Sequence, residues 1–288
     1  MPTRSARTAA AVALVLLLGA CAASAGDGSA EPAPPADTTV VLQVTEVGGY
    51  TTPALLTGRL PTVTVYADGR LITDGPVAAI WPAPALPNLQ VHLLDDGGVR
   101  DLVDRALAAG VAETGDLGQP PVTDVTATRF AVRTGGTTVT REAYALGMDL
   151  GPARDGEAGL TEDQTAARER LLAFLDELRD PAAALGAERV TGPEPYRPEA
   201  VAALVSPYVE VEPAQPEQRW PGPTLPGEPI APDLTCVTAT GAAARTLLDA
   251  AASASMATPW TAEDGSRWSV LLRPLLPHES GCADLPPA

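Results

Sequence analysis

The first 21 residues most constrain what this chain can become, because they decide the compartment in which the rest of it folds. Two arginines precede an apolar run over residues 9–18, which is too short to span a bilayer. Two small residues, Gly19 and Ala20, then lead directly to Cys21. This order is typical of a secretory signal peptide, so we expect residues 1–20 to be removed.

The stretch Leu14–Cys21 resembles the lipobox of bacterial lipoprotein signal peptides. The resemblance implies that the Cys21 thiol is lipidated, with palmitate-type acyl chains, and becomes the new N-terminus. It also implies a lipid-anchored protein on the extracytoplasmic face of the cell membrane. The alternative is an ordinary secreted protein with a chance cysteine at this position.

The overall charge excludes some partners. The chain of 288 residues carries 36 acidic and 19 basic side chains, which gives a formal net charge of −17. Such a charge repels nucleic acid and anionic lipid headgroups, because phosphate binding depends on clustered cations. We therefore expect no nucleic-acid partner.

Missing residue types exclude several reactions. All 19 basic side chains are arginines, so lysine Schiff bases, a P-loop lysine and serine–lysine pairs are ruled out. Only two histidines, His92 and His278, are available as general bases or metal ligands. His92 stands between Val91 and Leu93 in an alternating strand pattern, so we expect its side chain at the surface. We expect no covalent catalysis, no metal site and no cofactor.

The cysteine count suggests one disulfide. If Cys21 carries lipid, Cys236 and Cys282 remain as a pair, and an oxidising compartment favours a bridge between them. Closing a loop of this length stabilises a fold by about 4 kcal/mol through chain entropy. A zinc site at these two cysteines would need His278 and an acid as further ligands.

The N-terminal part is predicted to be a tether followed by an α+β domain. Residues 21–38, the lipidated cysteine and a stretch rich in small residues, proline and acids, form a flexible tether. In residues 39–185 the step Asp68-Gly69 between two β-prone runs predicts a hairpin. A helical stripe follows Asp95, and a capping box at Thr161 opens a second helix.

Residues 186–288 are predicted to form a proline-rich C-terminal α+β unit that contains the disulfide. Strands at 235–240 and 266–273 flank an alanine-rich helix at 241–253, whereas 201–205 is either a strand or a short helix. The fold class is therefore α+β, with antiparallel sheets, helices packed on one face and two small units forming one body.

Four segments carry a resemblance over most of the mature chain: Tyr66–Arg70, Trp81–Pro87, Thr258–Trp260 and Arg273–Cys282. They are similar to those of an uncharacterised family of actinobacterial secreted lipoproteins. The resemblance supports the location and the cysteine pair, and it implies no catalytic residues.

The run His278-Glu279-Ser280 contains a base, an acid and a hydroxyl. Neighbours in a loop seldom point at one another, and triads are normally assembled from distant segments. We favour a loop that braces the disulfide over a catalytic role.

The acidic pairs Asp95-Asp96 and Glu263-Asp264 invite a calcium hypothesis, but neither has the alternating spacing of a calcium loop. Helix caps and turns explain both better. A carboxylate pair for glycoside hydrolysis stays open, because 36 acids always supply some suitable pair.

Three tryptophans, Trp81, Trp220 and Trp260, lie beside proline or in turn-rich chain. Such rings can form a rigid platform for a glycan or a partner loop. The interpretation we favour is that they fill the core of a protein with only two phenylalanines.

Three function hypotheses follow. The first is a non-enzymatic binding or envelope accessory protein, whose partner is an envelope protein or a glycan. The second is a carboxylate-dependent hydrolase of cell-wall or glycan substrates. The third is a protease inhibitor that presents Thr57–Leu60, with Arg59 at its centre.

The lipobox makes a direct prediction. Two or more acyl chains hold a protein stably on a membrane, so Cys21→Ser should move the protein from the membrane fraction to the soluble fraction. Fractionation followed by immunoblotting checks this. A Cys21→Ser variant that stays membrane-bound would contradict the lipobox interpretation.

Overall fold

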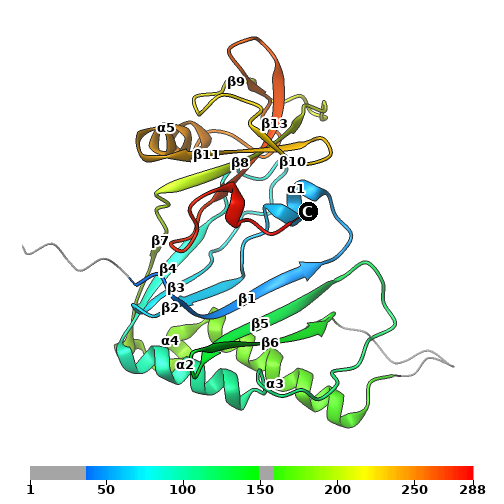
Figure 1. Ribbon diagram of the computed structural model, residues 1–288, viewed down its shortest axis with the longest axis vertical. Helices are drawn as coiled ribbons and strands as arrows, with labels where there is room; N and C mark the ends of the chain where they lie inside the picture. Colours follow the sequence, from blue (N-terminus) through cyan, green and yellow to red (C-terminus); the bar gives the residue numbers. More distant parts are fainter. Residues whose placement is uncertain (1–36, 149–158, 288) are drawn as a thin grey trace, which may run out of the picture. The chain divides into compact units, whose positions relative to one another are not determined.

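A computed structural model describes residues 37–148 and 159–287 and has the predicted α+β architecture (Figure 1). Its strands form two sheets, one of seven strands and one of six. The described residues form one compact unit.

The seven-stranded sheet has the order β6-β5-β1-β2-β3-β4-β7, and every neighbouring pair in it is antiparallel. The predicted hairpin is β2–β3, and its Gly69 has φ +91°. A Cβ at this position would lie 2.5 Å from the carbonyl oxygen of Leu94, so only glycine fits. The strands are β1 Val40–Gly48, β2 Val63–Tyr66, β3 Arg70–Asp74, β4 Leu89–Leu94, β5 Thr126–Thr134, β6 Thr137–Tyr144 and β7 Val190–Pro195.

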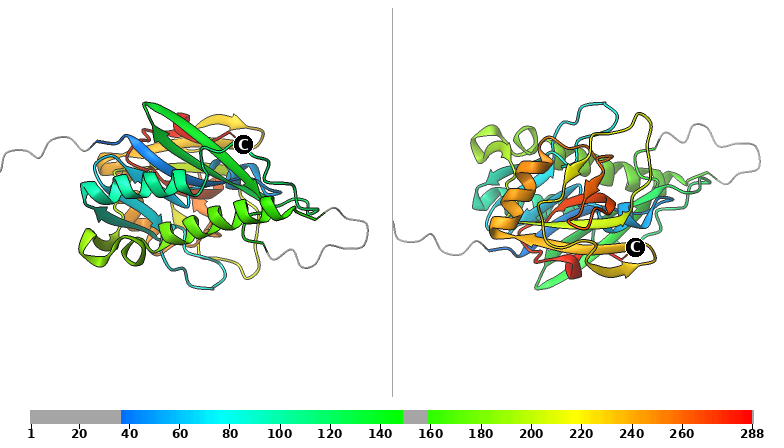
Figure 2. Two further views of the ribbon diagram at one scale, coloured as in Figure 1. Left: turned by 90° about the horizontal axis from the view of Figure 1, so that it is seen from below. Right: turned by 90° about the horizontal axis from the view of Figure 1, so that it is seen from above.

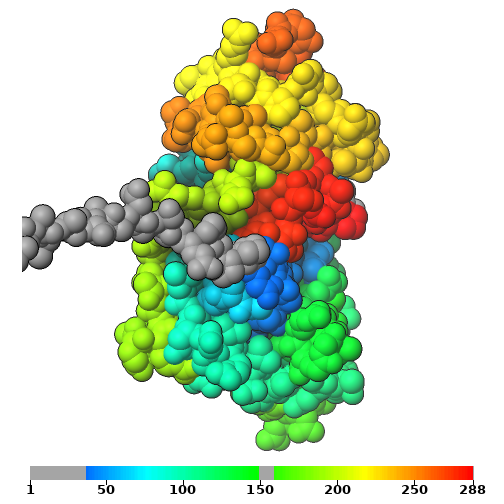
Figure 3. Space-filling view, turned by 60° about the vertical axis from the view of Figure 1, so that its left-hand side comes forward, coloured from blue at the N-terminus to red at the C-terminus, as the bar shows by residue number. Residues whose placement is uncertain are grey.

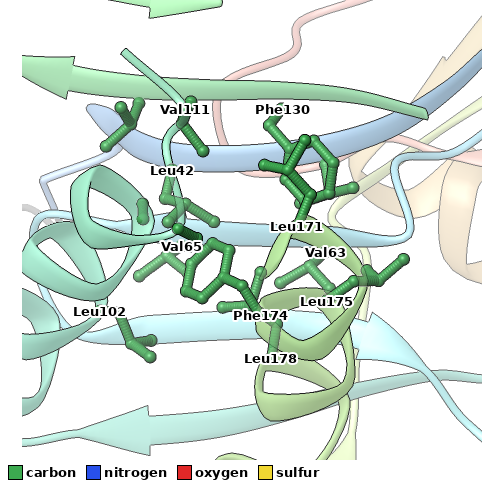
Figure 4. Packing of buried hydrophobic residues seen from close by; sticks show 14 of the residues in the cluster. Leu42, Val63, Val65, Leu102, Val111, Phe130, Leu171, Phe174, Leu175 and Leu178 are labelled. Carbon is green, nitrogen blue, oxygen red and sulfur yellow. The ribbon is translucent and has the colours of Figure 1, made fainter. Parts of the chain in front are cut away.

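Helices cover one face of this sheet (Figures 1 and 4). They are α2 Asp96–Ala108, α3 Glu162–Arg179 and the short α4 Pro181–Leu185, which is followed by the 3₁₀ turn Ala187–Arg189. Leu102 of α2 and Phe174 of α3 pack with Val63 and Val65 of β2 in a buried cluster. This cluster is the core of the first sheet.

Both long helices begin where the sequence predicts. The Asp95 carboxylate accepts a hydrogen bond from the backbone N–H of Gly98 at 2.6 Å and caps α2. Thr161 and Gln164 form a capping box at the start of α3. Asp95 therefore acts as a helix cap, as predicted.

The six-stranded sheet has the order β10-β11-β8-β13-β12-β9, and only its β9–β12 pair is parallel. The helix α5 Gly241–Ala251 packs on one face. The segment 201–205, left open as strand or helix, lies in the buried strand β8. The strands are β8 Ala200–Pro207, β9 Gln218–Arg219, β10 Glu228–Ala231, β11 Leu234–Thr240, β12 Trp260–Thr261 and β13 Arg267–Pro274.

A layer of irregular chain lies between the two sheets. It consists of the short helix α1 Pro53–Thr57 and residues 275–287, which we call the C-terminal segment and which includes the 3₁₀ turn Cys282–Asp284 (Figure 1). Leu276 of this segment packs on Tyr66 of the first sheet, and Leu275 packs on Leu204 of the second. The segment thus joins the two sheets.

A buried ion pair fixes the C-terminal segment. The guanidinium of Arg273 donates two hydrogen bonds to the Glu279 carboxylate, at 2.6 and 2.8 Å. The side chains are only 2% and 6% exposed. The same carboxylate accepts a bond from the backbone N–H of Leu276 at 2.7 Å, which holds the segment in a tight turn.

The predicted Cys236–Cys282 disulfide is confirmed, with the two Cα atoms 6.1 Å apart. It ties β11 to the C-terminal segment, and the backbone N–H of Cys282 also donates to the Thr238 hydroxyl at 3.1 Å. Two separate connections therefore hold this segment against the sheets.

The surface position predicted for His92 is wrong. His92 does lie opposite Leu89 and Val91, but it pairs in register with the buried Leu71 and is only 9% exposed. The prediction assumed that one face of β4 meets solvent. Helices cover one face, however, and residues of the inter-sheet layer cover the other.

Two of the three proposed platform tryptophans are core residues. Trp260 is fully buried and Trp220 is 7% exposed, and their rings meet edge to face with centroids 5.5 Å apart. A binding surface at Trp220 and Trp260 is therefore contradicted, because a protein with few phenylalanines fills this core with indole rings. Trp81 is 69% exposed.

The chain passes from the first sheet to the second after β7. The division expected near residues 185–186 would assign this strand to the C-terminal unit, but β7 pairs with β4 in the first sheet. The linker 196–199 then leads into β8.

The ion pair makes a stability prediction. Glu279→Gln leaves the buried Arg273 charge without its carboxylate, so we expect the free energy of unfolding to fall by about 3–5 kcal/mol in urea titrations. The matched control is Glu142→Gln, which breaks the Arg129–Glu142 pair, whose side chains are about half exposed. The control should lose less than about 1 kcal/mol. Equal losses in the two variants would contradict the proposed role of Glu279.

Candidate functional site

A groove with a volume of about 960 Å³ lies where the chain crosses between the sheets. Its lining comes from the approach to β4, the linker 196–199, one face of α5, and the adjoining ends of β8 and β13. Figure 3 shows α5 in orange above the yellow-green linker on one face of the molecule. The lining residues are Leu86, Pro87, Leu89, Tyr196, Arg197, Pro198, Glu199, Ala200, Thr240, Gly241, Arg245, Leu248, Asp249 and Pro274.

Helical periodicity places the α5 residues in the groove. Gly241, Arg245, Leu248 and Asp249 recur at spacings of three and four, so they share one side of the helix. The opposite side carries Leu247 into the core. One side of α5 therefore forms the groove wall, and its opposite side packs in the core of the second sheet.

Apolar groups form most of the remaining wall. Pro87 contributes from the approach to β4, Pro198 from the linker and Pro274 from the end of β13. Tyr196 lies between the two sheets, where its hydroxyl donates to the carbonyl oxygen of Leu275 at 2.8 Å. Burial raises the pKa of Tyr196 to about 12, so the phenol stays protonated and uncharged at neutral pH. The groove wall here is rigid and neutral.

Two arginines give the groove its chemistry. Arg197 and Arg245 are exposed, and neither makes an ion pair or a side-chain hydrogen bond with another described residue. Within residues 37–148 and 159–287, Arg133 is the only other arginine of this kind. The remaining arginines there pair with carboxylates or carbonyl oxygens. In a chain with a net charge of −17, two such guanidinium groups in one groove favour an anionic ligand.

A smaller cleft of about 410 Å³ lies between the first sheet and the C-terminal segment. Arg59, Arg129 and His278 line it, together with residues of β1. The His278 Nδ1 and the Tyr66 hydroxyl are hydrogen-bonded at 2.8 Å. Desolvation lowers the pKa of His278 and raises that of Tyr66, so both groups are neutral at neutral pH.

The run His278-Glu279-Ser280 does not form a catalytic arrangement. Glu279 binds Arg273, and His278 binds Tyr66. The Ser280 hydroxyl donates to Asp284 at 2.7 Å. Each side chain thus has its own partner elsewhere, and all three brace the segment that carries Cys282, as we favoured from the sequence.

The acidic groups give little support to a hydrolase. Burial raises the pKa of the Asp74 carboxyl, the direction expected for a general acid, but Asp74 lines neither cleft. The second acidic pair lies in a turn, where Asp264 accepts from the Ser266 N–H at 2.9 Å. Among the described residues, no group of three or more His, Cys, Asp or Glu side chains is arranged to hold a metal ion.

The segment proposed as an inhibitor loop does not protrude. Thr57 is 3% exposed, and Arg59 donates to the carbonyl oxygens of Glu46 and Gly48 at 3.1 and 2.9 Å. A reactive-site loop needs a free arginine, so this geometry lends the inhibitor hypothesis no support.

Other sequence predictions lie outside the described residues. Cys21, the signal peptide and most of the tether belong to residues 1–36. Within 37–148 and 159–287, no helix has the length and apolar character needed to cross a bilayer.

Comparisons with protein-family models, with curated proteins and with solved structures find no match to this chain.

No pattern in the sequence indicates the groove. Tyr196 and Arg197 lie in a proline-rich stretch without periodicity, and Arg245 reads as an exposed position of an amphipathic helix. Only the packing of α5 beside the inter-sheet linker brings them together.

The buried His92 makes stability depend on pH. Burial lowers the pKa of His92 below its ordinary value of 6.5, and the nearby Asp180 opposes the shift only in part. The unfolded chain therefore binds more protons in mildly acidic solution, and stability should fall as the pH drops below about 6.5. Urea unfolding between pH 7.5 and pH 5 measures this.

His92→Gln should flatten that dependence between pH 7.5 and pH 5. His278→Gln is the comparison, because His278 is an exposed residue whereas His92 is buried, and it should account for a smaller part of the change. If His92→Gln leaves the pH dependence unchanged, His92 is not the group responsible.

Proposed function

We propose that this chain is a lipid-anchored, extracytoplasmic binding protein of the bacterial envelope without catalytic activity. The proposal takes Cys21 as the lipidated residue and the chain as a member of the actinobacterial lipoprotein family that it resembles. Its ligand-binding site is the inter-sheet groove.

One observation carries this proposal: of the three arginines that make no ion pair or side-chain hydrogen bond with another described residue, the groove holds two. A volume of about 960 Å³ is large enough for a small molecule or a segment of a polymer. Guanidinium groups bind carboxylates and phosphates through paired hydrogen bonds. The ligand class is therefore an anionic one.

The other groove residues narrow the ligand class to an acidic glycan. Tyr196 and the proline rings offer flat apolar faces of the kind that stack on the C–H faces of sugars. Glu199 and Asp249 offer carboxylate oxygens that accept hydrogen bonds from sugar hydroxyls. Envelope glycans that carry carboxylates combine both features.

Binding is favoured over hydrolysis by the position of the acids. Glu199 lies on the irregular linker and Asp249 lies in α5, and both side chains are exposed. General acid catalysis at neutral pH normally uses a carboxyl group whose pKa is raised by burial. The exposed positions of Glu199 and Asp249 therefore suit hydrogen bonding to a ligand better than general acid catalysis.

Soluble acidic peptidoglycan fragments test the proposal by calorimetric titration. Replacing Arg197 and Arg245 together by glutamine removes two charged hydrogen-bonding groups, so affinity should fall about tenfold or more. The matched control is Arg133→Gln, which removes an unpartnered arginine outside the groove and should bind like the wild type.

A second ligand sharpens this test. The same fragments with their carboxyl groups amidated should bind the wild-type protein no better than the acidic fragments bind the double variant. Acidic fragments that do not bind, or that bind the double variant and Arg133→Gln equally, would contradict the proposal.

A further inference from the structure

The loop between β3 and β4 carries an exposed apolar tip. Residues 75–91 contain no charged side chain in a chain that is 19% charged. At the tip, Val77 is 78% exposed, Ile80 is 60% exposed and Trp81 is 69% exposed. Figure 2 shows this loop, in cyan, projecting beyond the neighbouring strands.

The base of the loop is held on both sides. The backbone N–H of Gly75 donates to the carbonyl of Asn88 at 2.7 Å, and the Asn88 amide donates to the carbonyl of Pro76 at 2.7 Å. Further along, the N–H of Ala85 donates to the Ala254 carbonyl at 3.0 Å. The tip is therefore presented outward on a fixed base.

A contiguous apolar projection of this kind calls for a physical explanation. Full burial of one large apolar side chain stabilises a fold by about 1.5–3 kcal/mol. Val77, Ile80 and Trp81 are mostly exposed, so each contributes only a small part of this stabilisation. Singly exposed apolar residues are ordinary, whereas clustered ones mark interaction sites.

We propose that the tip Val77–Trp81 contacts the lipid surface of the membrane to which Cys21 anchors the chain. This proposal rests on the lipid anchor of the proposed function. Sixteen peptide steps separate Cys21 from Asp37, and they span at most about 55 Å. The anchor thus confines the domain near the bilayer, where a weak apolar contact forms at high effective concentration.

The composition of the tip favours lipid over a protein partner. Between Pro76 and Pro87 the indole N–H of Trp81 is the only side-chain hydrogen-bonding group. Protein interfaces carry about one hydrogen bond per 100–200 Å² and a polar rim, which this stretch cannot supply. Tryptophan and uncharged apolar residues are the types enriched at the membrane–water interface.

The charge of the protein sets the conditions for contact. The acidic body is repelled by anionic headgroups, whereas the uncharged tip is not. We therefore expect contact with phosphatidylcholine vesicles, and weaker contact when anionic lipid is added at low salt. Added salt should restore it, because the Debye length shortens to about 8 Å at physiological ionic strength.

Trp81 is itself the probe. The acylated mature protein, residues 21–288, is reconstituted into phosphatidylcholine vesicles whose acyl chains carry bromine, and tryptophan emission is compared with that in unbrominated vesicles. Emission should be quenched in the wild type. The quenching should be lost in Trp81→Phe and kept in the matched control Trp268→Phe, whose partly buried side chain packs against the second core.

The outcomes separate the two proposals. Protein that floats with the vesicles but is not quenched by brominated lipid, while aqueous iodide still quenches Trp81, overturns the membrane contact and leaves the tip to a protein partner. Quenching that persists in Trp81→Phe also overturns it. Protein that does not float with the vesicles refutes the anchor, and the membrane contact falls with it.

Discussion

The arrangement of the two sheets depends on the buried ion pair between Arg273 and Glu279. Arg273 leaves the end of β13 on the side that faces the first sheet, where a guanidinium without a partner would be strongly unfavourable. The turn that returns Glu279 to it places Leu276 against Tyr66 and Ile72 of the first sheet. One electrostatic requirement thus directs the course of the chain between the sheets.

The candidate sites follow from that course. Because the C-terminal segment separates the sheets, the linker 196–199 must bridge them, and the groove forms between this linker and α5. The smaller cleft forms on the other side of the segment, beside His278. The Cys236–Cys282 bridge holds the same segment covalently, so the fold secures by two means the element that shapes both openings.

The hairpin at Gly69 and the cap at Asp95 could be predicted because each depends on a few neighbouring residues. The Cys236–Cys282 pair could be predicted from the number of cysteines that remain if Cys21 carries lipid. Burial was harder to predict. Alternation correctly separated His92 from its apolar neighbours, but no single strand reveals that both of its faces are covered. The groove could not be predicted from the sequence, because only the packing of α5 beside the linker brings Arg197 and Arg245 to the same groove.

Hydrogen exchange of the oxidised protein tests most directly whether the C-terminal segment is an integral layer of the fold. The N–H of Leu275 donates to Ala200, that of Leu276 to Glu279 and that of Cys282 to Thr238. The account predicts that these three amides exchange as slowly as those of the central strand β8. Rapid exchange of all three while β8 stays protected would contradict it.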